Sequence, residues 1–219
     1  MTKKLFFGVF IGVIVLFASA CGGGSKQSGS ETGSVDAEDP NKSFYHNSVF
    51  LGDSLLLGLS DVLGDSNVIA NAGATALFAI EKVDKIADKK PKHIYIMLGS
   101  DDLLMPVDNP KKDYLENYAK LIKKIKGKIP NVQIHVISVP PVTTEAMERE
   151  PRYKNISDYN EGLEKLAVTE KIDYIDLSSI FEEQQNLYGK DGIHFEESFY
   201  PLFLDHIKEH IDFSDGVLE

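Results

Sequence analysis

Five short apolar runs alternate with longer amphipathic segments once the chain passes Tyr45. Several of these runs are apolar on successive residues, which is typical of strands that are covered on both faces of a sheet. They predict β-strands at SVFLG (48–52), NVIANAG (67–73), HIYIMLG (93–99), VQIHVISV (132–139) and IDYIDL (172–177).

The segments between these runs carry apolar residues at helical spacing. They predict helices at 55–64, 76–89, 111–128, 156–171 and, after the last strand, about 197–210. Strict alternation of strand and helix is the pattern of an α/β domain in which helices cover both faces of a parallel sheet. We therefore expect a three-layer α/β/α sandwich with a five-stranded parallel sheet, and functional residues just beyond the carboxyl ends of its strands.

The first 20 residues have the pattern of a targeting segment. Two lysines, Lys3 and Lys4, precede an apolar run of 16 residues that ends in small side chains. A membrane span needs about 20 apolar residues, so this run is short for one, and it predicts a signal peptide at 1–20. The alternative is a simple N-terminal anchor helix.

The only cysteine of the chain, Cys21, follows this segment directly. The arrangement resembles a bacterial lipobox, in which the signal is cut before a cysteine that becomes lipidated, although Ala18 stands where leucine is usual. The resemblance implies an exported lipoprotein that is anchored through Cys21 to the extracytoplasmic face of the cell membrane. A lone cysteine also excludes an internal disulfide.

The residues after Cys21 are rich in glycine, serine and acidic side chains, with almost nothing to bury. Such a composition predicts a flexible tether, and 22 residues of it would span ~25 Å on average. We therefore expect the lipidated cysteine and tether at 21–43, one folded domain at 44–213 and a short tail at 214–219. The length of 219 residues suits one domain with a substantial core.

The charge of the chain limits its partners. The formal net charge is −11, and removal of Lys3 and Lys4 with the signal peptide would make it −13. A body this acidic does not attract nucleic acid and is repelled by anionic lipid. We expect no nucleic-acid partner, and a membrane contact made by the lipid on Cys21 rather than by the domain.

Residues that can carry chemistry follow four of the predicted elements. Glycine, aspartate and serine are ordinary loop residues, and Asp53 or Ser54 alone would be read as the N-cap of a helix near Leu55. The four groups together are more informative, because all are predicted to lie at one edge of the sheet. They are Gly52-Asp53-Ser54, NAG (71–73), LGSDD (98–102) and KDGIHF (190–195).

This order of blocks resembles the GDSL or SGNH hydrolase family. That family has a nucleophilic serine in a GDS block, a glycine block, a GxND block and a C-terminal DxxH. The matching residues here are Gly52-Asp53-Ser54, Asn71 with Gly73, Gly99 with Asp102, and Asp191 with His194, with minor agreement in DYN (158–160) and Tyr200. The resemblance covers about 46–210 and implies a flavodoxin-like fold and a serine esterase that uses neither a metal nor a cofactor.

The chemistry needs these residue types. A serine hydroxyl such as that of Ser54 is a poor nucleophile until a base removes its proton, and neutral histidine, here His194, suits that task near pH 7. Asp191 can accept the other imidazole N–H and stabilise the imidazolium. The order serine, aspartate, histidine along the chain also occurs in α/β-hydrolases. That fold is not supported here, because the sequence has no G-x-S-x-G elbow. The resemblance implies an oxyanion hole of the Ser54 and Gly73 backbone N–H groups and a side-chain amide from the third block.

The third block departs from the family, because Asp101 stands where GxND has asparagine. An ionised carboxylate only accepts hydrogen bonds and would repel an oxyanion, and loss of one donor costs about 10²–10³ in rate. Three interpretations stay open. Asp101 is protonated in a desolvated site and still donates; or activity runs slowly on two backbone donors; or the domain is a weakened or inactive relative that binds acylated ligands.

The substrate is expected from location and family range rather than from any pocket residue. O-acetyl groups on cell-wall or other polysaccharides are the first expectation. A lysophospholipase or thioesterase of the same family is one alternative, and a non-catalytic module that binds acylated glycans is another. Transfer of the acyl group to another sugar instead of water stays open.

Other polar features predict no further site. His206 and His210 are spaced i, i+4 on the last helix, a spacing that could serve a metal but that has no third ligand nearby in the sequence, so an exposed polar face is the simpler interpretation. His46, His93 and His135 flank or lie within strands, where a structural role is expected. The polar connection 143–153 forms either a wall of the cleft or an ordinary surface loop.

Overall fold

The computed structural model describes residues 39–183 and 186–216. The predicted signal peptide, Cys21 and almost all of the predicted tether lie outside the described residues. None of the helices in the described part of the chain has the length and hydropathy of a membrane span.

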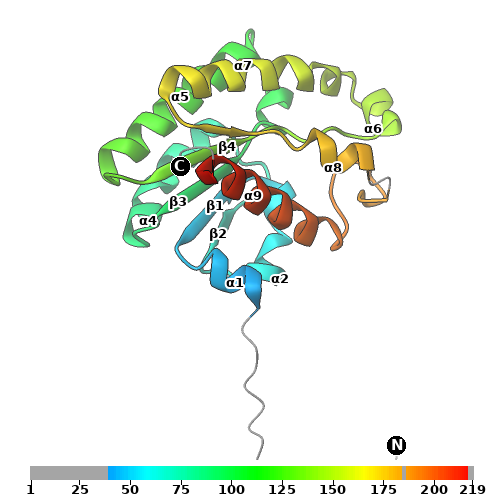
Figure 1. The fold of residues 1–219 in the computed structure, drawn as a ribbon. Coiled ribbons are helices and arrows are strands. Elements are labelled where there is room, and N and C mark those ends of the chain that lie inside the picture. Colours follow the sequence, from blue (N-terminus) through cyan, green and yellow to red (C-terminus); the bar gives the residue numbers. More distant parts are fainter. Residues whose placement is uncertain (1–38, 184–185, 217–219) are drawn as a thin grey trace, which may run out of the picture. The chain divides into compact units, whose positions relative to one another are not determined.

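A five-stranded sheet with all strands parallel organises the domain (Figure 1). The strand order is β2-β1-β3-β4-β5, which is the flavodoxin-like order and confirms the predicted fold class. Each strand lies inside one of the predicted runs, and all are shorter than predicted except the first. The strands are β1 (Ser48–Gly52), β2 (Val68–Ala70), β3 (His93–Met97), β4 (Gln133–Ile137) and β5 (Asp173–Ile175).

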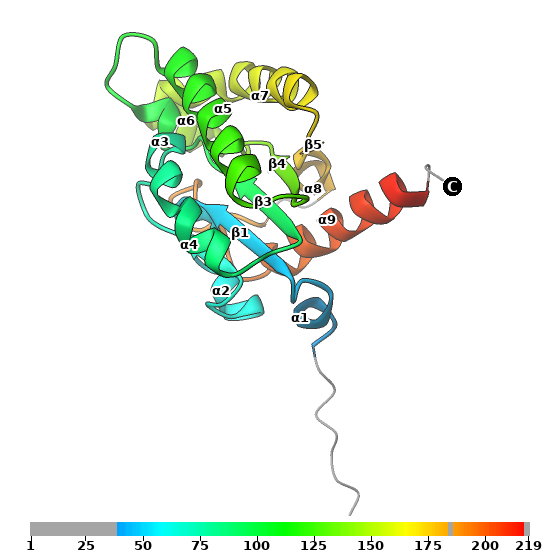
Figure 2. The ribbon, with the colours of Figure 1, turned by 90° about the vertical axis from the view of Figure 1, so that its left-hand side faces the viewer.

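Helices connect the strands and cover both faces of the sheet (Figure 2). Short 3₁₀ turns, η1 to η4, interrupt or extend several of them. The helices are α1 (Pro40–Phe44), α2 (Leu59–Leu63), α3 (Ala76–Ala79), α4 (Val83–Asp88), α5 (Pro110–Lys128), α6 (Thr144–Arg149), α7 (Ile156–Glu170), α8 (Ser178–Glu183) and α9 (Phe199–Gly216), and the turns are η1 (Ser54–Leu56), η2 (Ile80–Lys82), η3 (Asp102–Leu104) and η4 (Pro151–Asn155).

The helices differ from the predicted ones mainly in their division. The segment predicted as one helix at 55–64 is η1 followed by α2, and the segment 76–89 is α3, η2 and α4. Helix α1 begins at Pro40, inside the range expected to be tether, and α9 continues to Gly216, inside the expected tail. The polar connection 143–153 contains α6 and most of η4.

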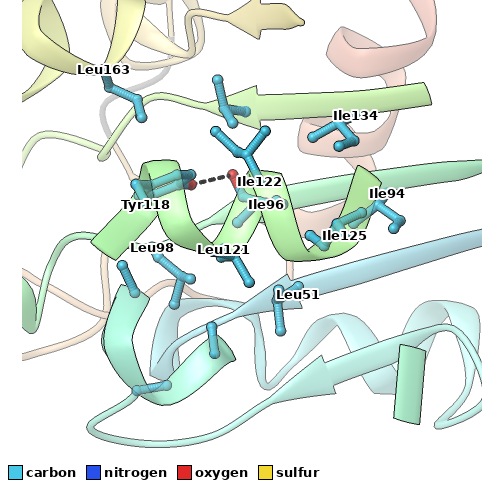
Figure 3. Packing of buried hydrophobic residues seen from close by; sticks show 14 of the residues in the cluster. Leu51, Ile94, Ile96, Leu98, Tyr118, Leu121, Ile122, Ile125, Ile134 and Leu163 are labelled. Carbon is cyan, nitrogen blue, oxygen red and sulfur yellow. Dashed lines mark hydrogen bonds between the residues drawn. The ribbon is translucent and has the colours of Figure 1, made fainter. Parts of the chain in front are cut away.

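Two apolar layers flank the sheet, and alternate strand residues enter each layer. Val49 and Leu51 of β1 join the layer formed with α3, α4, α5 and α7, which Figure 3 shows in part. Phe50, between them, joins the aromatic-rich layer formed with α2, α8 and α9. Because both faces are covered, most strand positions are apolar on successive residues. The loops that follow the carboxyl ends of the strands are not covered in this way, and they carry the candidate site.

Candidate active site

The turn after β1 presents Ser54 because the neighbouring aspartate caps the helix. Asp53 Oδ1 accepts a hydrogen bond from the Leu55 backbone N–H at 3.0 Å, and Asp53 Oδ2 accepts one from the Ser100 hydroxyl at 2.7 Å. Asp53 is therefore the N-cap of η1, and the Ser54 side chain is not used as a cap.

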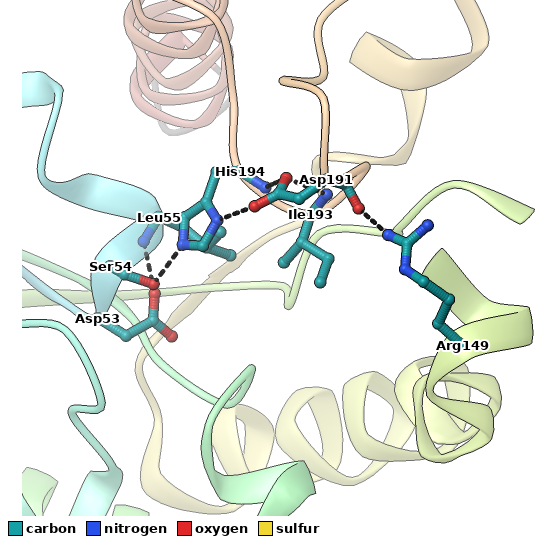
Figure 4. Close-up of polar contacts among 7 residues, drawn as sticks. All are labelled: Asp53, Ser54, Leu55, Arg149, Asp191, Ile193 and His194. Carbon is teal, nitrogen blue, oxygen red and sulfur yellow. Dashed lines mark hydrogen bonds and ion pairs between the residues drawn. The ribbon is translucent and has the colours of Figure 1, made fainter. Parts of the chain in front are cut away.

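Ser54, His194 and Asp191 form one hydrogen-bonded row (Figure 4). Asp191 Oδ2 lies 2.6 Å from His194 Nδ1, and His194 Nε2 lies 2.9 Å from Ser54 Oγ. An ionised carboxylate can only accept, so it assigns the imidazole proton to Nδ1 and leaves Nε2 to accept the Ser54 hydroxyl proton. The structure thus joins two segments 140 residues apart into an arrangement that can activate a hydroxyl group.

The charge of Asp191 is stabilised where it lies. Desolvation works against this charge, but the hydrogen bonds from the His194 side chain and from the backbone N–H groups of Ile193 and His194 outweigh it and lower the pKa of Asp191 to about 2. The side chains of Asp191 and His194 are nonetheless 47% and 49% exposed. This end of the hydrogen-bonded row is therefore exposed to solvent, so large molecules can reach it.

Helix α6 holds the loop that carries Asp191. The Arg149 guanidinium donates to the Asp191 backbone carbonyl (Figure 4). The Thr143 backbone N–H donates to the Gly192 carbonyl at 2.9 Å. Gly192 has φ +72°, and a Cβ atom there would lie 2.2 Å from Thr143 Oγ1, so only glycine permits this approach. Sequence reasoning did not identify Arg149; the available signal was Thr143 as an N-cap, since its hydroxyl accepts the Ala146 N–H.

Replacing Arg149 with alanine should lower kcat for ester hydrolysis about tenfold and change KM less, because a charge-assisted hydrogen bond contributes about 1.5–3 kcal/mol when buried and less when exposed, as here. Steady-state kinetics on a soluble ester measures the effect. Lys190→Ala, which removes the same charge from the loop next to Asp191, is the matched control. An equal loss in both variants would show that charge, and not the position of the loop, is responsible.

The third block holds the loops together through a buried carboxyl group. Both carboxylate oxygens of Asp102 lie 3.1 Å from the Ala76 backbone N–H, which fixes the start of α3 behind the glycine block. Burial raises the pKa of Asp102 to about 7 despite this hydrogen bond, and the charges of Asp53 and Asp101 add to the increase. Burial also raises the pKa of Asp53 to about 6, against the hydrogen bonds from Ser100 and Leu55.

Asp101 lies within electrostatic range of His194 and of the Gly73 backbone N–H. Its Oδ2 is buried and has no hydrogen-bond partner among the described residues. Desolvation raises the pKa of Asp101, and the charge of His194 and the backbone N–H of Gly73 oppose that increase. Gly73 has φ +76°, a conformation that favours glycine and that turns this N–H toward the site.

Two further side chains fix the strand ends around the site. The Asn160 side chain makes two hydrogen bonds with the Val139 backbone. Its Oδ1 accepts from the Val139 N–H at 2.8 Å, and its Nδ2 donates to the Val139 carbonyl at 2.9 Å. The Tyr200 hydroxyl donates to the Leu55 carbonyl at 3.2 Å, beside the turn that carries Ser54. These contacts give the minor sequence features DYN and Tyr200 a structural role.

Comparison with known proteins agrees with this geometry. The sequence model of the GDSL-like Lipase/Acylhydrolase family matches residues 50–201, which includes every residue of the hydrogen-bonded row. The chain belongs to this family. No curated protein matches the chain.

Solved structures of GDSL-like enzymes share the fold at low sequence identity. A GDSL-like lipase from Bacteroides thetaiotaomicron superposes with a TM-score of 0.63 at 19% identity, over 76% of this chain and 88% of that one. A lipase/acylhydrolase from Enterococcus faecalis gives 0.58 at 18% identity, over 75% and 95%. A catalytic mutant of an acetylxylan esterase from Geobacillus stearothermophilus gives 0.56 at 14% identity, over 74% and 92%.

The remaining histidines of this GDSL-like protein have separate contacts. His206 Nε2 lies 2.7 Å from the Asp176 carbonyl and His210 Nε2 lies 3.0 Å from Asp173 Oδ1, so the two rings do not share a partner. Asp173 also contacts buried His135, which in turn contacts His93. Within 39–183 and 186–216, no group of three or more histidine, cysteine, aspartate or glutamate side chains could hold a metal ion.

Proposed function

We propose that the protein is a serine esterase that hydrolyses carboxylic esters through an acyl-enzyme. Ser54 would be the nucleophile, His194 the general base and then acid, and Asp191 the group that orients and stabilises the imidazole. The observation that carries this proposal is the hydrogen-bonded row from Asp191 through His194 to Ser54, at the open edge of the sheet.

The reaction would run in two matched halves. Ser54 Oγ attacks the ester carbonyl carbon while its proton passes to His194 Nε2, and the carbonyl oxygen becomes an oxyanion. The tetrahedral intermediate collapses, the bond to the alcohol breaks, and His194 returns the proton to the leaving alcohol. Water then repeats these steps on the acyl-enzyme and releases the acid. The Ser54 and Gly73 backbone N–H groups are the donors that we assign to the oxyanion.

The substrate that we propose is an O-acetyl group on a cell-wall or other polysaccharide. An open row of catalytic groups is accessible to a polymer that could not enter a deep pocket. The acetylxylan esterase among the structural neighbours is consistent with this choice.

The place of action would be the outer face of a bacterial membrane, with the domain attached through a lipid on Cys21. The sequence of the leader and tether supports this location. Mass spectrometry of the exported wild type should find Cys21 as the first residue, carrying lipid, and Cys21→Ser should carry none. A wild-type protein that keeps its leader and has no lipid on Cys21 would argue for the uncleaved anchor helix instead.

A second candidate is a lysophospholipase or thioesterase activity, and one observation favours it. Five of the seven large hydrophobic side chains that are exposed in the described structure lie on segments after the carboxyl ends of β1, β2 and β3. Such a set could contact a long acyl chain that enters the same site. These side chains are Leu57, Leu77, Phe78, Met105 and Val107.

Two measurements test the proposal. Acetate release from O-acetylated peptidoglycan and from acetylated xylan, beside a series of esters with acyl chains of increasing length, separates the two candidates. A fluorophosphonate probe should label the protein on Ser54, which peptide mass spectrometry locates. Binding to acetylated glycan with neither hydrolysis nor labelling would mean that the domain is a non-catalytic binding module, and acetyl transfer to a sugar would appear as acetylated product without acetate.

A further inference from the structure

Asp101 introduces a negative group at the place where the proposed reaction develops negative charge. One of its oxygens, Oδ2, is buried without a partner among the described residues, and the Gly73 backbone N–H favours the charge of this carboxyl group. Gly73 is also a donor that we assign to the oxyanion. While Asp101 is ionised it therefore competes for a donor that the reaction needs.

Desolvation disfavours the ionised form of Asp101, and the Gly73 backbone N–H only partly offsets this effect. An ionised Asp101 in turn raises the pKa of the buried carboxyl groups of Asp53, after β1, and Asp102, in η3, and the Tyr153 hydroxyl from η4 also lies within electrostatic range. His194 opposes this trend only when it is positively charged. Before catalysis His194 must be neutral, so in the reactive state this opposing charge is absent.

The two protonation states of Asp101 have opposite effects on the oxyanion. An ionised carboxylate repels the developing charge and keeps the Gly73 N–H for itself. A neutral carboxylic acid has one O–H that can donate to the oxyanion, and it holds the Gly73 N–H less strongly. The proton of the neutral acid stays on Asp101 throughout. The proton of Ser54 passes to His194, and the oxyanion is stabilised by hydrogen bonds without taking a proton.

We propose that Asp101 is a protonation switch on the oxyanion hole, so that the esterase works with a neutral Asp101 and is turned off when this carboxyl group ionises. The inference rests on the proposed esterase function and adds its regulation. The active form needs Asp101 protonated and His194 neutral at the same time, and the two groups titrate as a coupled pair. Activity should therefore rise with pH as His194 loses its proton and fall again as Asp101 loses its own, which gives a bell-shaped profile.

The test is the pH dependence of kcat/KM for a soluble ester between pH 4 and 9, in the wild type and in Asp101→Asn, with the rate of the buffer alone subtracted. The asparagine amide is a permanent donor, so the variant should rise to a plateau with no alkaline decline. At pH 9 it should exceed the wild type by about 10²–10³-fold, which is the effect of one oxyanion donor, and the two profiles should converge toward acid pH.

Three controls make the outcome decisive. Asp108→Asn changes an exposed aspartate of the same loop and should keep the wild-type profile. Wild type held at pH 9 and returned to pH 6 should recover full activity, which separates the switch from unfolding. A wild-type plateau at pH 9, or an alkaline decline that persists in a folded Asp101→Asn, overturns the switch alone, whereas equal rates in the wild type and Ser54→Ala at every pH overturn the esterase function itself.

Discussion

Replacing Ser54 with alanine should lower kcat for ester hydrolysis by about 10⁶-fold, because a methyl group cannot form the acyl-enzyme. His194→Ala should cost a similar factor, since the hydroxyl group then has no base. Asp191→Asn should cost about 10⁴-fold, because the amide assigns the imidazole proton to the wrong nitrogen. Rates over this range are measured in single-turnover assays with the enzyme in excess. Each variant is purified separately.

The double variant Ser54→Ala/His194→Ala distinguishes a catalytic row from two independent effects. Residues that act as a unit are not additive, so the double variant should be no slower than either single one. Ser66→Ala, an exposed serine after α2, should keep wild-type kinetics. If the loss of kcat in the double variant equalled the product of the losses in the two single variants, a shared mechanism would be contradicted.

Replacing Phe203 with alanine should reduce the free energy of unfolding by about 3–5 kcal/mol. Phe203 is fully buried on α9, and its ring lies 5.4 Å from that of Phe199 and 6.1 Å from that of Phe50 in β1. The substitution would leave a cavity between the last helix and the strand that precedes the nucleophile turn. Urea unfolding followed by circular dichroism measures the change.

Val168→Ala on α7 is the control, because this side chain is 75% exposed and its loss should change stability by less than about 0.5 kcal/mol. Since Tyr200 on the same helix as Phe203 contacts the Leu55 carbonyl, Phe203→Ala should also lower activity at temperatures where the protein is still folded. A loss below 1 kcal/mol would mean that α9 packs more loosely than the structure indicates.

The strands could be predicted from the sequence because burial on both faces leaves a continuous apolar run. Phe50 and Leu51 face opposite layers, yet both had to be apolar, so the run SVFLG marked β1 without any knowledge of its partners. The order of the chemical blocks was also visible, since parallel strands all end at one edge. Ser54, Asp191 and His194, which the sequence singled out, are the residues that the structure joins.

Contacts between distant segments could not be predicted in the same way. Taken alone, the turn after the first strand allowed either Asp53 or Ser54 to be the helix cap. Only the Ser100 hydroxyl, 47 residues away, shows why Asp53 turns inward. Arg149 lay in a stretch that reads as a polar connection, and its contact with the Asp191 carbonyl depends on how α6 meets the loop. Asp101 stood out by its type, but its unpartnered oxygen depends on packing that no local pattern encodes.

The two edge strands of the sheet are also its shortest strands. β2 and β5, at the two edges, have three residues each, whereas the three inner strands have five. A short edge offers few free backbone groups to a strand from another molecule, so it is a poor template for intermolecular β-pairing. Copies of this domain crowded together on a surface would therefore have little tendency to join edge to edge, which would leave the catalytic loops of each copy free to meet a polymer.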